Sequence, residues 1–137
     1  MMIGFTARRP RVASLCRLVG RQCHCSRRCV YLLDEHFDFP TDEDINDFIS
    51  WVRPTQFNWV HEIHDCDDLA FEFRVKAKTW FRARGLNIAI GTLARQATSL
   101  QKAHAFNFFI RKSDHKLIFI DKFERVPIAG RAYLVIL

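Results

Sequence analysis

The stretch "CDDLAFEFRVKAKTWFRARG", residues 66–85, carries the strongest helical pattern in this 137-residue chain. Its apolar side chains recur at steps of three and four, and most of its charged side chains fall between them. Gly85 suits the position after a helix, because glycine adopts the left-handed backbone conformation without steric cost. The spacing predicts one buried face, formed by Cys66, Leu69, Ala70, Phe73, Ala77, Trp80 and Phe81.

A second helix is expected just upstream, in "TDEDINDFISWV", residues 41–52. Thr41 can accept a hydrogen bond from the backbone at Asp44, and Asp44 can reach back to Thr41, as in a capping box. Pro54 ends this helix, because the residue before a proline avoids the helical conformation.

Four strand-like runs follow the helices. They are "LNIAIGTL" (86–93), "HAFNFFI" (104–110), "KLIFID" (116–121) and "AYLVIL" (132–137), with a loop expected at 94–102. Helices followed by a run of strands predict an α+β fold, in which the helix from Cys66 packs on an antiparallel sheet. The hydrophobic content of 49% favours one packed domain, and the absence of an apolar run of about 20 residues favours a soluble protein without a membrane span.

The net charge of +6 is concentrated at one end of the chain. Residues 1–28 hold seven arginines and no acid, so we expect 1–29 to be a basic leader outside the fold and 30–137 to be the single domain. The leader could be a transit-like peptide, a nucleic-acid-binding arm or an over-extended start. Four of the five cysteines lie in this segment, at positions 16, 23, 25 and 29, but their spacing does not match the C-x2-C pairs of common zinc sites.

The two central strand runs predict a hairpin with a potential site at its end. A turn centred on Lys112–Ser113 would place His104 directly opposite Asp121, close enough for the carboxylate to hold the imidazole. Cys66, at the start of the long helix, would supply a thiol favoured as thiolate by the helix dipole.

These three residue types are the parts of a thiol hydrolase. Cys66 would be the nucleophile, His104 the general base and Asp121 the residue that orients the imidazole. The backbone N–H of Cys66 could stabilise an oxyanion, with Gln56 or Asn58 as a second donor. The competing interpretation is a cysteine buried in a structural helix beside a core histidine.

The residues "WVHEIHDCDDLAFEFRVKAKTW" (59–80), "HAFNFFI" and "KLIFID" resemble the papain-like, transglutaminase-like cysteine peptidases. They are most similar to the peptidase domain of the mushroom agglutinins with its small bacterial and phage relatives, and also to bacterial transglutaminase-like cysteine proteinases. The resemblance implies a papain-like fold, a Cys66–His104–Asp121 triad and a protein or peptide substrate. It departs at Asp121-Lys122, where the agglutinin branch tends to have Glu-Pro.

Acidic residues surround the cysteine, at Asp65, Asp67 and Asp68. When ionised they would raise the pKa of the thiol, and a hard cation such as calcium would cancel that effect. Several peptidases of the resembling family depend on calcium, so we expect calcium as a cofactor at these three residues. The alternative is ordinary helix chemistry, with Asp65 as N-cap and the other two favoured in the first turn.

Other functions remain open on the sequence alone. The same triad could serve a transglutaminase or an amidase, and the domain could instead be a non-catalytic binding module with a basic nucleic-acid-binding arm. His61 and His64 do not form the HExxH pattern of zinc peptidases, although with Cys66 they could hold a transition metal. By analogy with the bacterial and phage relatives, we expect a cytoplasmic location.

Overall fold

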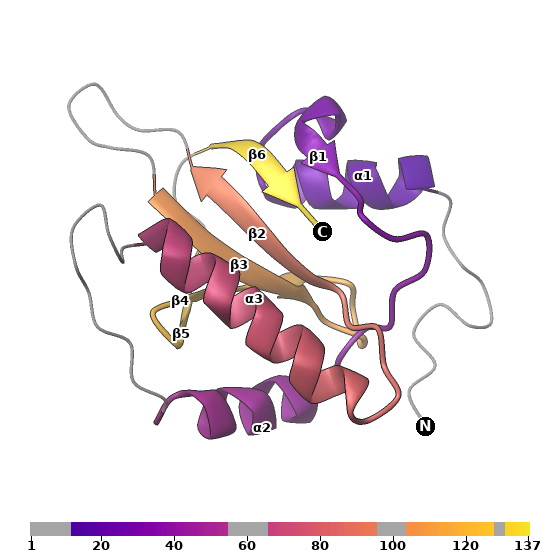
Figure 1. Ribbon diagram of the computed structural model, residues 1–137. Coiled ribbons are helices and arrows are strands. Elements are labelled where there is room, and N and C mark those ends of the chain that lie inside the picture. Colours follow the sequence, from indigo (N-terminus) through magenta and orange to yellow (C-terminus); the bar gives the residue numbers. More distant parts are fainter. Residues whose placement is uncertain (1–11, 55–65, 96–103, 128–130) are drawn as a thin grey trace.

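A computed structural model describes residues 12–54, 66–95, 104–127 and 131–137. In this part of the chain, helices flank a six-stranded sheet whose strand order is β1-β6-β2-β3-β4-β5 (Figure 1). The helices are α1 (Val12–Gln22), η1 (Arg27–Cys29, a 3-10 helix), α2 (Asp42–Val52) and α3 (Cys66–Arg82). The strands are β1 (Val30–Tyr31), β2 (Ile90–Arg95), β3 (His104–Ile110), β4 (Leu117–Asp121), β5 (Glu124–Val126) and β6 (Ala132–Ile136). The predicted α+β class is confirmed.

The sheet is antiparallel from β6 to β5, but its β1–β6 pair is parallel. This corrects the expected all-antiparallel sheet. The sequence also did not reveal β1 and β5, because two or three residues carry too little periodicity to recognise. Strand β2 begins at Ile90, later than expected, since the chain just before it pairs with Asp38 through Ile88 and Ala89.

The two predicted helices are present with the expected ends. Thr41 accepts a hydrogen bond from the Asp44 backbone at 3.0 Å, and the Asp44 carboxylate accepts one from the Thr41 backbone at 3.0 Å, so the capping box is confirmed. Gly85 follows α3 with φ +78°, a conformation that favours glycine. The buried positions of α3 are Leu69, Ala70, Phe73, Ala77 and Phe81; Cys66 and Trp80 are half-buried.

Helices α2 and α3 cover one face of the sheet and form an aromatic core with it (Figure 1). The fully buried Phe48 of α2 packs against rings from α3 and β3. The buried members of this cluster are Ile45, Phe48, Ile49, Val52, Phe73, Ala77, Phe81, Ile88, Ile90, Phe109 and Ile120.

Helix α1 contributes to a second buried cluster with the other face of the sheet. Leu15, Val19 and Cys23 are each at most 5% exposed and pack with Phe108 and Val135. Residues 12–29 therefore belong to the fold, in place of the separate leader that we expected. The helical spacing of the apolar residues in α1 was not recognised, because the arginines dominated the composition of the segment.

The four cysteines of this N-terminal segment, at positions 16, 23, 25 and 29, are free thiols. Burial raises the pKa of Cys23 to about 12, with a further contribution from the neighbouring Cys25, so this thiol stays protonated at neutral pH. Cys16 donates a weak hydrogen bond to the Val30 carbonyl. Among the residues that the structure describes, no three His, Cys, Asp or Glu side chains are grouped to hold a metal ion.

Gly91 allows an aromatic ring to lie across the sheet. It is paired with Phe108, and a Cβ atom at residue 91 would lie 2.1 Å from Phe108 Cζ. Because the Phe108 ring is fully buried, it cannot swing away to make room. The glycine is thus required for close packing of β2 and β3.

An ion-paired turn joins β3 to β4. Arg111 donates to both carboxylate oxygens of Asp114, at 3.0 and 2.8 Å, and also to Asp42 at 3.2 Å. The hydrogen bonds from Arg111 hold the pKa of Asp114 well below its usual range. Charged groups in this turn therefore connect the β3–β4 hairpin to the start of α2.

We expect Arg111→Gln to weaken the acid dependence of stability. The folded-state pKa of Asp114 is depressed, so its contribution is present above the unfolded pKa of about 3.9 and is lost as the pH falls through the folded value. The decrease in melting temperature between neutral pH and about pH 2 should be smaller in Arg111→Gln than in the wild type. Arg53→Gln is the control, because Arg53 donates to the Phe123 carbonyl and, among the residues that the structure describes, to no carboxylate. An unchanged acid dependence in Arg111→Gln would contradict the assignment.

Candidate functional site

The ends of β3 and β4 bring His104 and Asp121 together. Nε2 of the His104 ring donates a hydrogen bond to Oδ2 of Asp121 at 2.8 Å. The two side chains are 26% and 27% exposed, so both can be reached from solvent. The imidazole also stacks on the Phe106 ring, with centroids 5.6 Å apart and an angle of 25° between the planes. The result is a polar pair held in place by an apolar neighbour at the edge of the core.

The register that forms this pair differs from the expected one. Asn107 pairs with Ile120 and Phe108 with Phe119, so the partner that we predicted for His104 is displaced by two residues. His104 and Asp121 are therefore diagonal neighbours, which long side chains can still bridge. A two-residue displacement keeps both side chains on the same face of the sheet, and this preserves the hydrogen bond.

The hairpin after Asp121 is unusually strained. Lys122 and Phe123 both have positive φ, at 50° and 65°, as in a type I′ turn. Asn-Gly is the usual sequence for this turn, so the pair Lys-Phe gave no recognisable signal. Phe123 is partly buried against the aromatic core, and this packing offsets the strain. The turn fixes the direction in which the chain leaves Asp121.

Cys66 opens α3 and is half-buried. Along β3, His104 lies two and four residues before Phe106 and Phe108, so its side chain starts on the same face of the sheet as theirs. Phe106 and Phe108 pack in the core on the α1 side, whereas Phe109 packs on the α3 side. The imidazole thus begins on the face of the sheet that α3 does not cover. Among the described residues, no hydrogen bond joins Cys66 to His104, so the structure unites two of the three predicted site residues.

Several other predicted site residues fall outside the described part of the chain. These are Gln56 and Asn58, proposed as oxyanion donors, His61 and His64, and Asp65, proposed as a calcium ligand and N-cap. Asp67 and Asp68 lie in the first turn of α3. Calcium takes six to eight oxygen ligands, and no group of three candidate ligands occurs among the described residues. The described residues do not assemble a calcium site, and calcium binding stays a prediction that depends on Asp65.

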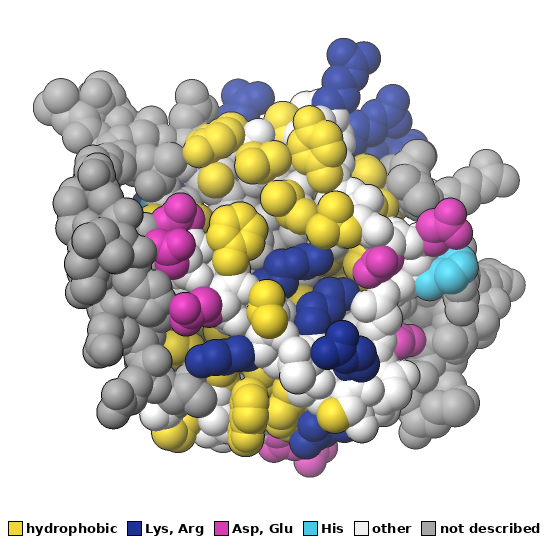
Figure 2. All heavy atoms as spheres, in the orientation of Figure 1, with side chains coloured by type: hydrophobic (Ala, Val, Ile, Leu, Met, Phe, Trp, Pro, Cys, Tyr) yellow, Lys and Arg dark blue, Asp and Glu magenta, His cyan; other side chains and the backbone are white. Residues whose placement is uncertain are grey.

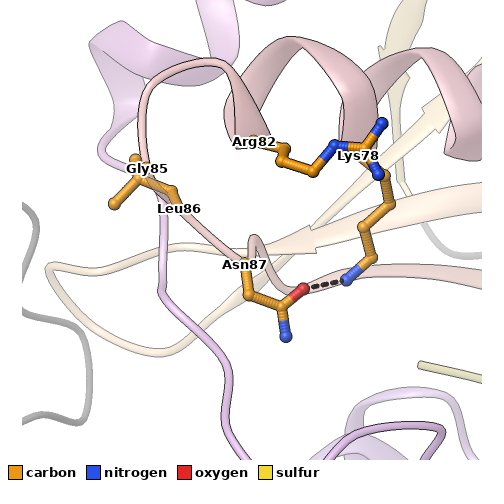
Figure 3. Close-up of a pocket in the computed structure, with 5 residues that line it drawn as sticks. All are labelled: Lys78, Arg82, Gly85, Leu86 and Asn87. Carbon is orange, nitrogen blue, oxygen red and sulfur yellow. Dashed lines mark hydrogen bonds between the residues drawn. The ribbon is translucent and has the colours of Figure 1, made fainter.

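A hollow of about 300 Å³ lies at the C-terminal end of α3 (Figure 3). It is lined by Lys78, Arg82, Gly85, Leu86 and Asn87. Lys78 donates to Asn87 Oδ1 at 2.8 Å and to the Ile88 carbonyl at 3.0 Å.

Lys78 and Asn87, which line this hollow, both contact Asp34. Burial lowers the pKa of Lys78, Arg74 lowers it further, and Asp34 opposes the change across an ion pair of 3.7 Å. The Asn87 amide donates to Asp34 at 3.1 Å. Because the polar groups of Lys78 and Asn87 are already used within the protein, we interpret the hollow as a joint between α3 and the residue 34–38 segment.

A buried amide between helix and sheet was missed by the sequence analysis. Asn107 is 3% exposed, and its Nδ2 atom lies 2.9 Å from the Ala70 carbonyl, 3.2 Å from the Gly91 carbonyl and 3.0 Å from Thr92 Oγ1. It ties α3 to β2 and β3 close to Cys66. The sequence pattern that could have indicated this contact is a polar residue within the apolar run "HAFNFFI". A polar side chain buried in such a run needs hydrogen-bond partners.

Comparison with known proteins relates the chain to an agglutinin family. A family model described as "Agglutinin C-terminal" matches residues 46–126. No curated protein matches the chain. A solved structure described as "PSL1a-E64 complex" has 23% identity and a TM-score of 0.65; the match covers 79% of this chain and 42% of that one.

A second solved structure is Polyporus squamosus lectin bound to the human-type influenza-binding epitope Neu5Aca2-6Galb1-4GlcNAc. Its identity to this chain is 19% and its TM-score is 0.68, over 92% of this chain and 48% of the lectin. At these identities the similarity shows the fold alone. This chain spans less than half the length of either solved protein.

These comparisons overturn the prediction of an enzyme. The matched family is an agglutinin family and the solved relatives include a structure named as a lectin, so the predicted cysteine-dependent hydrolase with its peptide substrate is corrected. The correction extends to the transglutaminase or amidase alternative. What holds from the resemblance is the relation to the mushroom agglutinins. Among the described residues, no helix has the length and apolar character to cross a membrane.

Proposed function

The chain belongs to the agglutinin C-terminal family, and from this premise we propose that it is a non-catalytic binding domain whose ligand is a glycan. The observation that carries the proposal is the family match, which extends over more than half of the chain and includes α3 and strands β2 to β5. The lectin with a bound sialylated epitope supports the ligand class, because its fold is similar to this one. The basic nucleic-acid-binding arm has no support from the comparisons.

The papain-like arrangement belongs to the same proposal. It is supported by the packing of α3 on β2 and β3 through Ala77, Ile90 and Phe109. On this interpretation the fold supplies a rigid support for a binding edge, since one fold can serve unrelated functions through different sites.

We assign the ligand contact to His104 and Asp121. Glycans present hydroxyl groups that both donate and accept hydrogen bonds, and a carboxylate with an imidazole offers both an acceptor and a ring nitrogen. The mutual hydrogen bond of 2.8 Å holds both side chains in one orientation before a ligand arrives, which lowers the entropic cost of binding. Their partial exposure leaves the second carboxylate oxygen within reach of a ligand.

We expect Asp121→Asn and His104→Gln each to weaken glycan binding by about tenfold or more. A hydrogen bond to a charged group contributes about 1.5–3 kcal/mol, and about 1.4 kcal/mol corresponds to tenfold in affinity. Isothermal titration calorimetry with sialylated and neutral lactosamine oligosaccharides measures the change. Glu124→Gln is the matched control, because this exposed carboxylate lies on the neighbouring strand β5. A glycan affinity that both variants retain would contradict the assigned edge, and wild-type protein without affinity for any glycan would contradict the function.

Two earlier expectations remain predictions. Calcium binding at Asp65, Asp67 and Asp68 is tested by thermal unfolding with calcium or with a chelator, since a ligand that binds the folded state raises the melting temperature. The cytoplasmic location is likewise a prediction.

A further inference from the structure

The arginines of α1 and η1 form one exposed basic surface. Arg17, Arg21, Arg27 and Arg28 are all exposed, and we refer to these four residues as the α1–η1 basic face. Residues 12–29 contain no acidic side chain. Figure 2 shows Lys and Arg side chains projecting over α1, at the top of the view, without acidic side chains among them.

The backbone brings the two halves of this face together. Arg17 and Arg21 are four residues apart on α1, so they project from the same side of the helix. The chain then turns back, and a Cβ atom at Gly20 would lie 3.0 Å from the Cys25 carbonyl oxygen and 3.2 Å from the Arg27 backbone nitrogen. The glycine allows η1 to lie directly against the last turns of α1. The backbone of Arg27 is consequently held close to the last turn of α1, on which Arg21 lies.

Two arginines elsewhere in the described chain are used within the protein. Arg111 pairs with Asp42 and Asp114, and Arg125 pairs with Asp42. The guanidinium groups of Arg21 and Arg28, in contrast, have no hydrogen-bonded or ion-paired partner among the described residues. Exposed positive charges that lack internal counter-charges, as at Arg21 and Arg28, attract a polyanion.

We propose that the α1–η1 basic face binds an acidic glycan, a sulfated polysaccharide of the heparin type. The inference rests on the proposed glycan-binding function and adds a second contact surface, separate from the His104–Asp121 edge. Arginine suits sulfate groups because its planar guanidinium donates two parallel hydrogen bonds to an oxyanion. A linear polyanion can contact several arginines at once.

The composition of the face favours a polysaccharide over a single-stranded nucleic acid. Proteins that bind single-stranded nucleic acids present aromatic side chains on which bases stack, and residues 12–29 contain no Phe, Tyr or Trp. A nucleic acid would have only its phosphates to offer here. Binding at this face would therefore depend only on contacts between guanidinium groups and the regularly spaced anionic groups of the ligand.

The test compares two double variants of the full chain on heparin. Arg21→Gln/Arg28→Gln removes two charges from the face, and Arg82→Gln/Arg84→Gln removes two exposed charges at the end of α3. We expect the first to weaken heparin binding about tenfold at about 0.1 M salt and to reduce the slope of log affinity against log salt by about two. The second should change the affinity by no more than about twofold.

Equal losses in the two double variants would overturn the proposal, because they would show a response to net charge alone. Displacement of heparin by duplex DNA at a lower charge concentration would overturn the choice of ligand. The two proposals fail separately. Oligosaccharide binding that persists without heparin binding refutes the basic face alone, whereas heparin binding together with an oligosaccharide affinity that Asp121→Asn leaves unchanged refutes the His104–Asp121 edge alone.

Discussion

Replacing Phe48 by alanine lowers the free energy of unfolding by about 3–5 kcal/mol. The side chain is fully buried, and its ring centroid lies 5.3 Å from that of Phe73, 5.9 Å from that of Phe81 and 6.1 Å from that of Phe109. Phe48 therefore links α2 to both α3 and β3. Its removal leaves a cavity that these rings cannot fill, since each is held by further ring contacts.

Urea-induced unfolding followed by circular dichroism measures this effect. Phe71→Ala is the matched control, because Phe71 lies on α3 with 50% of its surface exposed and should change stability by less than about 1 kcal/mol. If the two variants lose similar stability, α2 does not pack on α3 as described.

Replacing Asn107 by aspartate should lower stability at neutral pH by about 3–5 kcal/mol, although the side chain keeps its size. Its Nδ2 atom faces the carbonyl oxygens of Ala70 and Gly91, so a carboxylate would place an oxygen opposite two acceptors in a buried position. Burial opposite two carbonyl acceptors raises the pKa of a carboxyl group above its unfolded value. The variant is then most stable below the unfolded pKa and loses stability as the pH rises through the folded one.

Unfolding measured at about pH 4 and at neutral pH tests both parts of this prediction. Asn46→Asp serves as the control, because Asn46 is exposed and its Oδ1 accepts a hydrogen bond from Arg125, which a carboxylate can also do. A variant at residue 107 that is as stable as the control at neutral pH would mean that Asn107 does not face the two carbonyl groups.

Helices α2 and α3 could be predicted because local signals determine them. The capping residues Thr41 and Asp44, the spacing of Phe73, Ala77 and Phe81, and the stop at Gly85 all act within a few residues. Secondary structure of this kind needs no knowledge of the tertiary fold. Strands β3 and β4 were recognised for a similar reason, since each is a continuous apolar run between polar turns.

Features that depend on distant segments could not be predicted. Strand β1 is formed by Val30 and Tyr31, which pair with Val135 and Ile136 at the other end of the chain. The role of α1 in the core was hidden by its arginines, because the composition of a segment does not reveal which face is buried. The β4–β5 turn at Lys122 and Phe123 is stabilised by packing and not by turn chemistry.

The contact between His104 and Asp121 was predicted from the sequence, whereas the enzymatic function inferred from it is contradicted by the comparisons. His104 and Asp121 do meet, because a register displaced by two residues keeps both on one face of the sheet. The pairing of a histidine with a carboxylate suggested a general base, yet the same pair can serve as a fixed hydrogen-bonding edge. Residue types alone do not distinguish these roles, and the binding role of this pair is part of our proposal.

The central claim, a binding domain without catalysis, is tested most directly by Cys66→Ala. Glycan affinity and the hydrolysis of peptide and amide substrates are measured together in this variant and in the wild type, with and without calcium. The account predicts equal glycan affinity in the two proteins and no hydrolysis by either of them. Hydrolysis by the wild type, including self-cleavage, that disappears in Cys66→Ala would contradict it.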